Sequence, residues 1–271
     1  MRDDSIDRSV QGGRGVAVAC LSGLVLLFSG CEFREHPAGI ASDRPADKHR
    51  WSDLDLLPDF SSGIWEIPMT PAAFAASEPP SFTPVYAARV EAFAKAEAAG
   101  SMQESPSAAC VPPGMPGIMW QPYPLQILFS PNEVVIQQEA YMQVRHIYTD
   151  GRQHPTGLTP TFNGHSIGHW EGQLLVVDTT GFVTETPMGA AWGTFHSDRM
   201  HIVERFRLLD ADTLEVSTTV DDSQALTKPW TTVRAFKRHR DWDIAEYICE
   251  QNNRNGLDDR GNSRIDLQPP Q

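Results

Sequence analysis

Beyond residue 124 the chain consists largely of short segments with the pattern of β-strands. They are rich in β-branched and aromatic residues and are separated by turn residues. The segments are residues 125–130, 133–140, 142–149, 165–170, 173–179, 201–209, 213–220, 231–238 and 244–249. Because most links between them are short, the sequence predicts an all-β domain. We expect an antiparallel, calycin-like barrel or strongly curved sheet of eight or nine strands, with a two-sheet sandwich as the alternative.

Alternation within the segments supports this prediction. Leu214, Val216 and Val220 fall on one face of residues 213–220, whereas Glu215 falls on the other. Gly172 is suited to a tight hairpin between two segments, because glycine adopts a positive φ without strain. Both features fit strands with one face toward a core.

The first half of the chain has a different organisation. An apolar face on residues 86–99 predicts one helix, which Gly100 ends. Residues 105–124 are rich in proline and glycine, so we expect an irregular strap against the domain. The predicted units are a signal peptide over 1–30, a lipidated cysteine and flexible tether over 31–58, a single barrel-like domain over 59–252 and a disordered tail over 253–271.

Residues 16–31 form an apolar run that ends in small residues and Cys31. The run is shorter than the roughly 20 residues that span a bilayer, and it is typical of a removable export signal. Its end, Phe-Ser-Gly-Cys at 28–31, resembles a lipobox, although leucine is usual at the first position. We therefore expect a bacterial envelope protein that faces the periplasm through a lipid at Cys31. Cleavage of an ordinary signal peptide without lipidation is the alternative.

The remaining cysteines follow from that prediction. Cys20 leaves with the signal and Cys31 carries the lipid, so the mature chain retains Cys110 and Cys249. An oxidising envelope favours a disulfide between them. Two buried free thiols are the alternative.

The charge and motifs exclude several functional classes. The formal net charge is −13 and no basic patch occurs, which argues against nucleic acid as a partner. The chain has no Gly-x-Ser-x-Gly elbow, P-loop or dinucleotide fingerprint. We therefore expect no cofactor, and the sequence names no protein partner.

From about residue 109 to residue 253 the chain resembles a family of exported bacterial proteins of unassigned function. The matching motifs are Cys-Val-Pro-Pro-Gly-Met-Pro at 110–116, Pro-Tyr-Pro at 122–124, Arg-His-Ile-Tyr-Thr-Asp-Gly-Arg at 145–152, Gly-His-Ser-Ile-Gly-His-Trp-Glu-Gly at 164–172, Leu-Val-Val-Asp-Thr-Thr-Gly-Phe at 175–182, His-Ser at 196–197 with His-Ile-Val-Glu-Arg at 201–205, and Asp-Asp at 221–222 with Lys-Pro-Trp at 228–230. This resemblance implies no activity. A weaker resemblance joins Gly-Ile-Trp at 63–65 to the opening of lipocalin barrels, and it favours the calycin-like fold.

Glu204 is the leading candidate for chemistry. It lies between Ile202 and Phe206 on one strand face, so alternation carries its carboxylate inward. A buried carboxylate needs a partner or has a raised pKa. One interpretation is a structural ion pair with Arg145 or Arg234, and the other is a general acid or base in an apolar cavity.

Histidines provide the other candidate groups. His201 and Glu204 are predicted on opposite faces of their strand, so one site does not easily use both. A metal site from His165, His169 and His196 is geometrically easier, but this spacing is no metal signature. We therefore predict no metal site.

Arg145 precedes a turn at residues 148–152 that has both a structural and a ligand-binding interpretation. Asp178 is predicted to face inward like Glu204. The candidate catalytic residues are Glu204, His201, His165 and Arg145, and the candidate ligand-binding residues are Trp170, Asp178, Trp192, His196 and Trp230.

These residues support three hypotheses about function. In the first, the barrel binds a small apolar or aromatic molecule, and can act on it as a cofactor-free isomerase, lyase or hydrolase. In the second, the protein is a structural or interaction lipoprotein with a filled barrel. The third is a metal-dependent hydrolase.

Overall fold

The computed structural model describes residues 51–68, 70, 78–99, 110–184, 186–189, 193–249, 255–257 and 263–265. Contacts divide the chain into Met1–Ser42 and Asp43–Gln271, and all described residues belong to the second unit. The predicted signal peptide, the lipidation site Cys31 and the candidate ligand-binding residue Trp192 lie outside the described residues. Within the described ranges, no helix is long and apolar enough to span a membrane.

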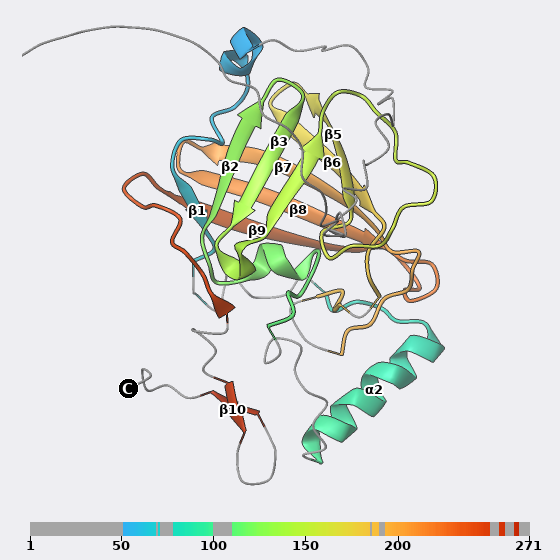
Figure 1. The fold of residues 1–271 in the computed structure, drawn as a ribbon. Helices are drawn as coiled ribbons and strands as arrows, with labels where there is room; N and C mark the ends of the chain where they lie inside the picture. Colours follow the sequence, from blue (N-terminus) through green and yellow to red (C-terminus); the bar gives the residue numbers. More distant parts are fainter. Residues whose placement is uncertain are drawn as a thin grey trace, which may run out of the picture. The chain divides into compact units, whose positions relative to one another are not determined.

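A closed barrel of nine strands dominates the fold, as predicted (Figure 1). Neighbours in sequence are neighbours in the barrel, and β9 pairs with β1 to close it. The strands are β1 (Ile64–Glu66), β2 (Leu125–Ser130), β3 (Glu133–Gln138), β4 (Val144–Tyr148), β5 (His165–Glu171), β6 (Leu174–Thr180), β7 (His201–Asp210), β8 (Thr213–Asp221) and β9 (Trp230–His239).

The barrel is not antiparallel throughout, which corrects the prediction. β4 and β5 run parallel, and they are in register at Ile147–Ser166 and Tyr148–Ile167. A parallel pair needs a connection of a dozen or more residues, because the chain must return to the end at which the first strand began. Residues 149–164 form this connection. The pairing between β4 and β5, called the seam below, extends over these two residue pairs.

The helix is confirmed as α2 (Pro84–Ala98), but none of its residues is buried. Its Phe93 packs edge-on against Phe195 with ring centroids 5.9 Å apart. The strand predicted at 244–249 is wrong. β1 already occupies the free edge of β9, so no edge is left for another strand at this position.

The segment after β9 is held by side chains instead. Tyr247 packs against Tyr123 and Tyr141, with ring centroids 5.2 and 5.5 Å away. Cys249 forms the predicted disulfide with Cys110, and their Cα atoms are 5.7 Å apart. The bridge therefore fixes the segment after the last barrel strand to the strap that precedes β2.

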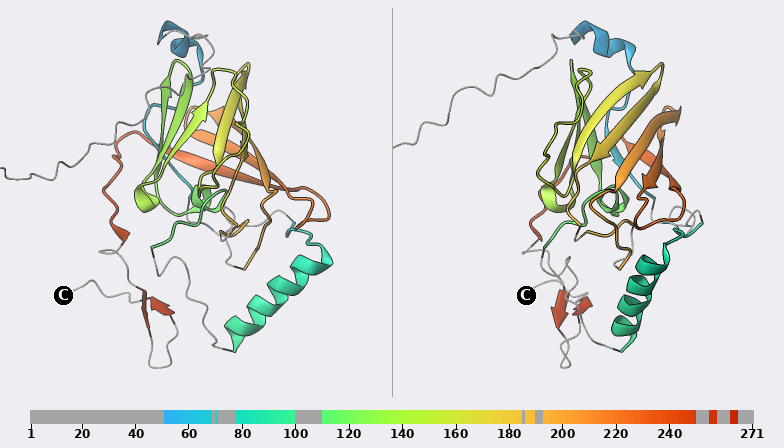
Figure 2. Two further views of the ribbon diagram at one scale, coloured as in Figure 1. Left: turned by 45° about the vertical axis from the view of Figure 1, so that its right-hand side comes forward. Right: turned by 90° about the vertical axis from the view of Figure 1, so that its right-hand side faces the viewer.

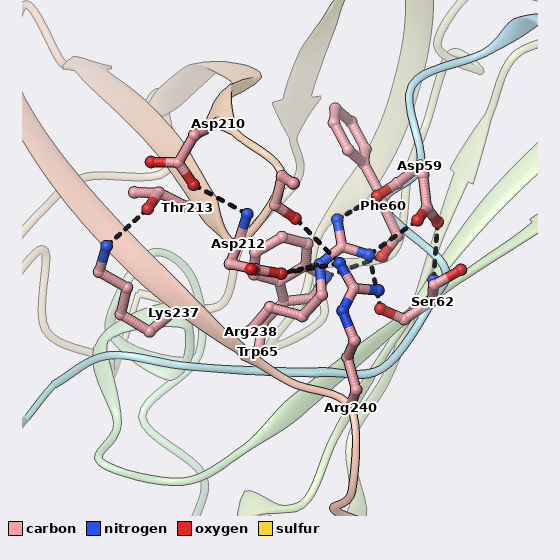
Figure 3. A network of polar contacts seen from close by, with 11 residues as sticks. Asp59, Phe60, Ser62, Trp65, Asp210, Asp212, Thr213, Lys237, Arg238 and Arg240 are labelled. Carbon is pink, nitrogen blue, oxygen red and sulfur yellow. Dashed lines mark hydrogen bonds and ion pairs between the residues drawn. The ribbon is translucent and has the colours of Figure 1, made fainter.

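Figure 3 shows the polar network that fastens the closure between β1 and β9. The guanidinium of Arg238 lies 4.3 Å from the ring centroid of Trp65 and donates hydrogen bonds to the Asp59 side chain at 2.9 Å and the Ser62 carbonyl at 2.6 Å. The Trp65 indole donates to the Phe60 carbonyl at 2.7 Å. Because Arg238 and Asp59 come from opposite ends of the domain sequence, this contact ties the two together.

Apolar side chains from the strands make one continuous core. Alternate residues face the core in strands such as β3, β7 and β9, as the period of two requires. Trp65, Phe206 and Phe236 are among the largest fully buried side chains. The short 3-10 helix η2 (Gly117–Trp120) is buried throughout and adds Met119 to the same cluster.

The remaining elements are small. Trp51–Leu56 form a 3-10 helix, η1, within the segment predicted as tether. Ala140–Met142 form η3, between β3 and β4. Asn255–Leu257 and Ser263–Ile265 pair as β10 and β11 within the predicted tail. Two further views of the arrangement are given in Figure 2.

Candidate functional site

Glu204 lies in the barrel interior with none of its surface exposed, as alternation predicts. Its carboxylate forms an ion pair with Arg145, which is 2% exposed. Arg145 also donates to the hydroxyls of Ser166 at 3.1 Å and Thr179 at 2.9 Å. β4, β5, β6 and β7 each contribute one of these four residues, so the pair crosslinks the strands on both sides of the parallel seam.

This enclosure assigns the pair of Arg145 and Glu204 to stability. The predicted general acid or base required Glu204 to face an open cavity near His165 or His201. Both histidines lie on the opposite, outer face of their strands, because His201 is three positions from Glu204 and His165 is one position from Ser166, and odd offsets along a strand place side chains on opposite faces. The carboxylate of Glu204 and the two histidines therefore lie on opposite faces of the strands.

A histidine cluster forms on the outer face of β5, β6 and β7. It consists of His165, Asp178 and His201 from these strands and His154 from the connection between β4 and β5. Asp178 was predicted to face inward, which is wrong: Val177 and Thr179 fill the interior and leave Asp178 outside, with 41% of its side chain exposed. Asp178 on β6 is paired with Val203, which is two residues from His201 on β7. His165 on β5 is paired with Thr180, which is two residues from Asp178. The strand register therefore makes these three side chains neighbours on one face.

Short contacts connect the histidine cluster. Asp178 Oδ1 lies 2.9 Å from Nε2 of His154 and 2.9 Å from Nε2 of His201. The Nδ1 atoms of His154 and His165 are 2.8 Å apart. A carboxylate accepts protons, so Nε2 of His154 carries a hydrogen and its Nδ1 accepts one from His165 when both rings are neutral. This pattern leaves the Nε2 lone pair of His165 available.

The surroundings of His165 favour the neutral form of its imidazole. Partial burial lowers the pKa of its imidazole from the usual 6.5, and the neighbouring His154 and Arg152 lower it further. A proton taken up at Nε2 can be passed through Nδ1 to His154, where the charge lies beside Asp178. The arrangement is that of a base supported by a carboxylate.

A groove of about 290 Å³ lies beside His165 at the seam. β4 contributes Val144, Arg145, His146 and Tyr148 to its wall, and residues 161–166 contribute the facing wall. Asn163 spans part of it, since its amide donates to the Val144 carbonyl at 3.2 Å. Tyr148 places its ring centroid 5.5 Å from that of His165, and Arg152 lies 3.8 Å from the centroid of Tyr148.

The cluster does not have the geometry of a metal site. His154 uses one ring nitrogen for Asp178 and the other for His165, so the donors do not converge on one point. Across the described ranges, no group of three or more His, Cys, Asp or Glu side chains is arranged to hold a metal ion. The trio considered from the sequence is dispersed: His169 pairs with Glu171, and His196 is buried elsewhere.

The other predicted ligand-binding residues pack against the protein itself. Trp170 lies against Phe60, with ring centroids 5.7 Å apart. His196 bonds to the hydroxyl of Thr186 at 3.1 Å and to a backbone carbonyl at 2.8 Å. Trp230 meets Trp120 edge-on at 5.9 Å. None of these three residues contributes to the groove at the seam.

His154 was not predicted from the sequence. It lies in a stretch without strand or helix periodicity, between Arg152 and Pro155, and no motif marks it. The length of the connection at residues 149–164 could have indicated its position, because a connection this long can join parallel strands and then runs beside β5.

Searches against protein-family models, curated proteins and solved structures find no match to this chain.

Proposed function

We propose that this protein is a lipid-anchored protein of the bacterial envelope that binds a small molecule at the seam groove and acts on it as a cofactor-free acid/base enzyme. The observation that supports this proposal is the hydrogen-bonded series from Asp178 through His154 to His165, which ends at the groove. Such a series orients the imidazole of His165, and the lowered pKa keeps that imidazole neutral and able to accept a proton, as a general base requires.

Each residue has a distinct role in this proposal. His165 accepts a proton from the bound molecule at Nε2. His154 and Asp178 are positioning residues that fix its tautomer and hold the transferred charge. Tyr148, Val144 and Phe162 give the groove an apolar and aromatic wall, which suits a small molecule with an apolar or aromatic part. Proton abstraction in an isomerase, lyase or hydrolase reaction fits these groups.

The test compares His165→Gln with His169→Gln. Both histidines lie on the outer face of β5, but His169 pairs with Glu171 and does not line the groove. Each purified protein is incubated with a small-molecule extract, and bound and consumed compounds are identified by mass spectrometry. We expect the wild type and His169→Gln to consume the same compound, and His165→Gln to bind it with turnover reduced about 100-fold or more.

Equal turnover by His165→Gln would refute the assignment of the base. The enclosed ion pair of Arg145 and Glu204 and the apolar core occupy much of the interior, which supports a second candidate function, that of an interaction lipoprotein. Absence of any bound or consumed compound in all three proteins would favour that second function.

A further inference from the structure

Arg234 is a buried cation without a carboxylate partner among the residues that the structure describes. It points inward from β9 with 7% of its surface exposed, and it follows the inward-facing Thr232 on the same strand face. Its Nη1 donates to the carbonyl of the adjacent Val233 at 3.1 Å, and its guanidinium lies 5.3 Å from the ring centroid of Trp120. Its Nε is buried and has no hydrogen-bond partner.

No carboxylate of the described residues compensates this charge. The buried carboxylates among them are those of Glu204, Asp150 and Asp222. Glu204 pairs with Arg145, Asp150 pairs with Arg152, and Asp222 accepts hydrogen bonds from Ser197. Burial lowers the pKa of Arg234 from its usual 12.5, and no neighbouring acid opposes this effect. The inward-facing charges of Arg145, Glu204 and Arg234 therefore sum to one positive charge.

Further unsatisfied atoms lie on the same interior surface. The Thr232 hydroxyl is buried without a partner, and so are Nη1 of Arg145 and Oε1 of Glu204. Thr232 is in register with Thr218, which is in register with Glu204, so these side chains form one row across β9, β8 and β7. Arginine has only donors, and a buried donor without an acceptor is costly. The unsatisfied carboxylate oxygen, Oε1 of Glu204, lies two strands away on β7, so Nε of Arg234 has no acceptor of its own among the described residues.

We propose that the barrel interior beside Arg234 binds a monoanion, either a halide or a small carboxylate. The anion accepts hydrogen bonds from Nε of Arg234 and the Thr232 hydroxyl and neutralises the unpaired charge. The ring of Trp120, which meets Trp230 edge-on, covers the guanidinium on its apolar side. This site is distinct from the seam groove, whose lining includes neither Arg234 nor Thr232.

Thermal denaturation at constant ionic strength tests the proposal. Sodium gluconate, whose anion is too bulky for a small interior site, is replaced stepwise by sodium bromide, acetate or benzoate. Because a ligand that binds only the folded state stabilises it by mass action, the Tm of the wild type rises with bromide or with one of the carboxylates. The response to each salt identifies the class of monoanion. Equal Tm values in all four salts would overturn the proposal.

Matched variants locate the effect. Arg234→Met removes the cation from the interior, whereas Arg205→Met removes an exposed arginine from the outer face of β7. We expect Arg205→Met to retain the anion-dependent rise in Tm and Arg234→Met to lose it. In gluconate alone, Arg234→Met is at least as stable as the wild type, because it removes an unpaired buried charge. An anion response that persists in Arg234→Met contradicts the site.

A crystal of the wild type grown with bromide gives a direct readout that does not depend on the folding of any variant. The proposal requires an anomalous peak within hydrogen-bond reach of Arg234 Nε if the anion is a halide, and carboxylate density at the same place in crystals with acetate or benzoate. Ordered water alone on Arg234 and Thr232 in all three crystals would overturn it.

Discussion

Glu204→Gln removes the negative charge that faces Arg145 in the barrel interior and leaves the shape of the side chain almost unchanged. Arg145 is 2% exposed and Glu204 is 0% exposed, so water cannot take over the role of the carboxylate. Removal of one partner from a buried ion pair costs about 3–5 kcal/mol. The glutamine carbonyl can still accept one hydrogen bond, which places the expected loss near 3 kcal/mol in the free energy of unfolding.

Such a loss is large enough to measure by thermal or urea denaturation followed by circular dichroism. For a domain of about 200 residues it corresponds to a fall in Tm of roughly 6–12 °C. Glu215→Gln is the matched control, because Glu215 on β8 pairs with Arg207 on β7 across the exposed face of the same two strands. An exposed pair contributes only about 0–1 kcal/mol.

The double variant Arg145→Met with Glu204→Leu separates the charge from the packing. It removes both charges together, and the hydroxyls of Ser166 and Thr179 still hydrogen-bond each other at 3.0 Å. We therefore expect the free energy of unfolding of the double variant to lie within about 1–2 kcal/mol of the wild type. This loss is much smaller than the sum of the losses in the two single variants. A loss below about 1 kcal/mol in Glu204→Gln, or additive losses in the double variant, would refute the argument.

Three other predictions concern closure, protonation and anchoring. Arg238→Met should lower the free energy of unfolding by about 2–4 kcal/mol in urea denaturation, whereas Arg240→Met, from an exposed ion pair, should cost no more than about 1 kcal/mol; similar losses would contradict the closure network. Because the folded pKa of His165 is below 6.5, its contribution to stability is complete above pH 6.5 and is lost as the pH falls between 6.5 and the folded value. His165→Gln should therefore flatten this part of the profile of unfolding free energy against pH, and an unchanged slope would contradict the prediction. Cys31→Ala should move the protein from the membrane to the soluble fraction, and unchanged fractionation would exclude the lipid anchor.

Local pattern in the sequence was sufficient for the strands β2 to β9 and for the burial of Glu204, but it missed β1 and predicted a strand at 244–249 that does not form. Alternation depends only on which residues are next to each other, so the inward face of β7 follows from Ile202 and Phe206 without knowledge of its partners. The disulfide of Cys110 and Cys249 was predicted by a comparable argument, since only these two cysteines remained for pairing. These features were predicted because each depends on a short stretch of chain or a simple count.

The tertiary structure decided which of these elements meet. The parallel pairing of β4 and β5 and the approach of His154 to His165 follow from the path of residues 149–164, which has no periodic pattern. The outward position of Asp178 follows from which face of β6 the closed barrel turns inward. The contact of Arg238 with Asp59 likewise joins residues that no local rule connects. Such contacts depend on how the barrel closes, and closure is a property of all nine strands together rather than of any one segment.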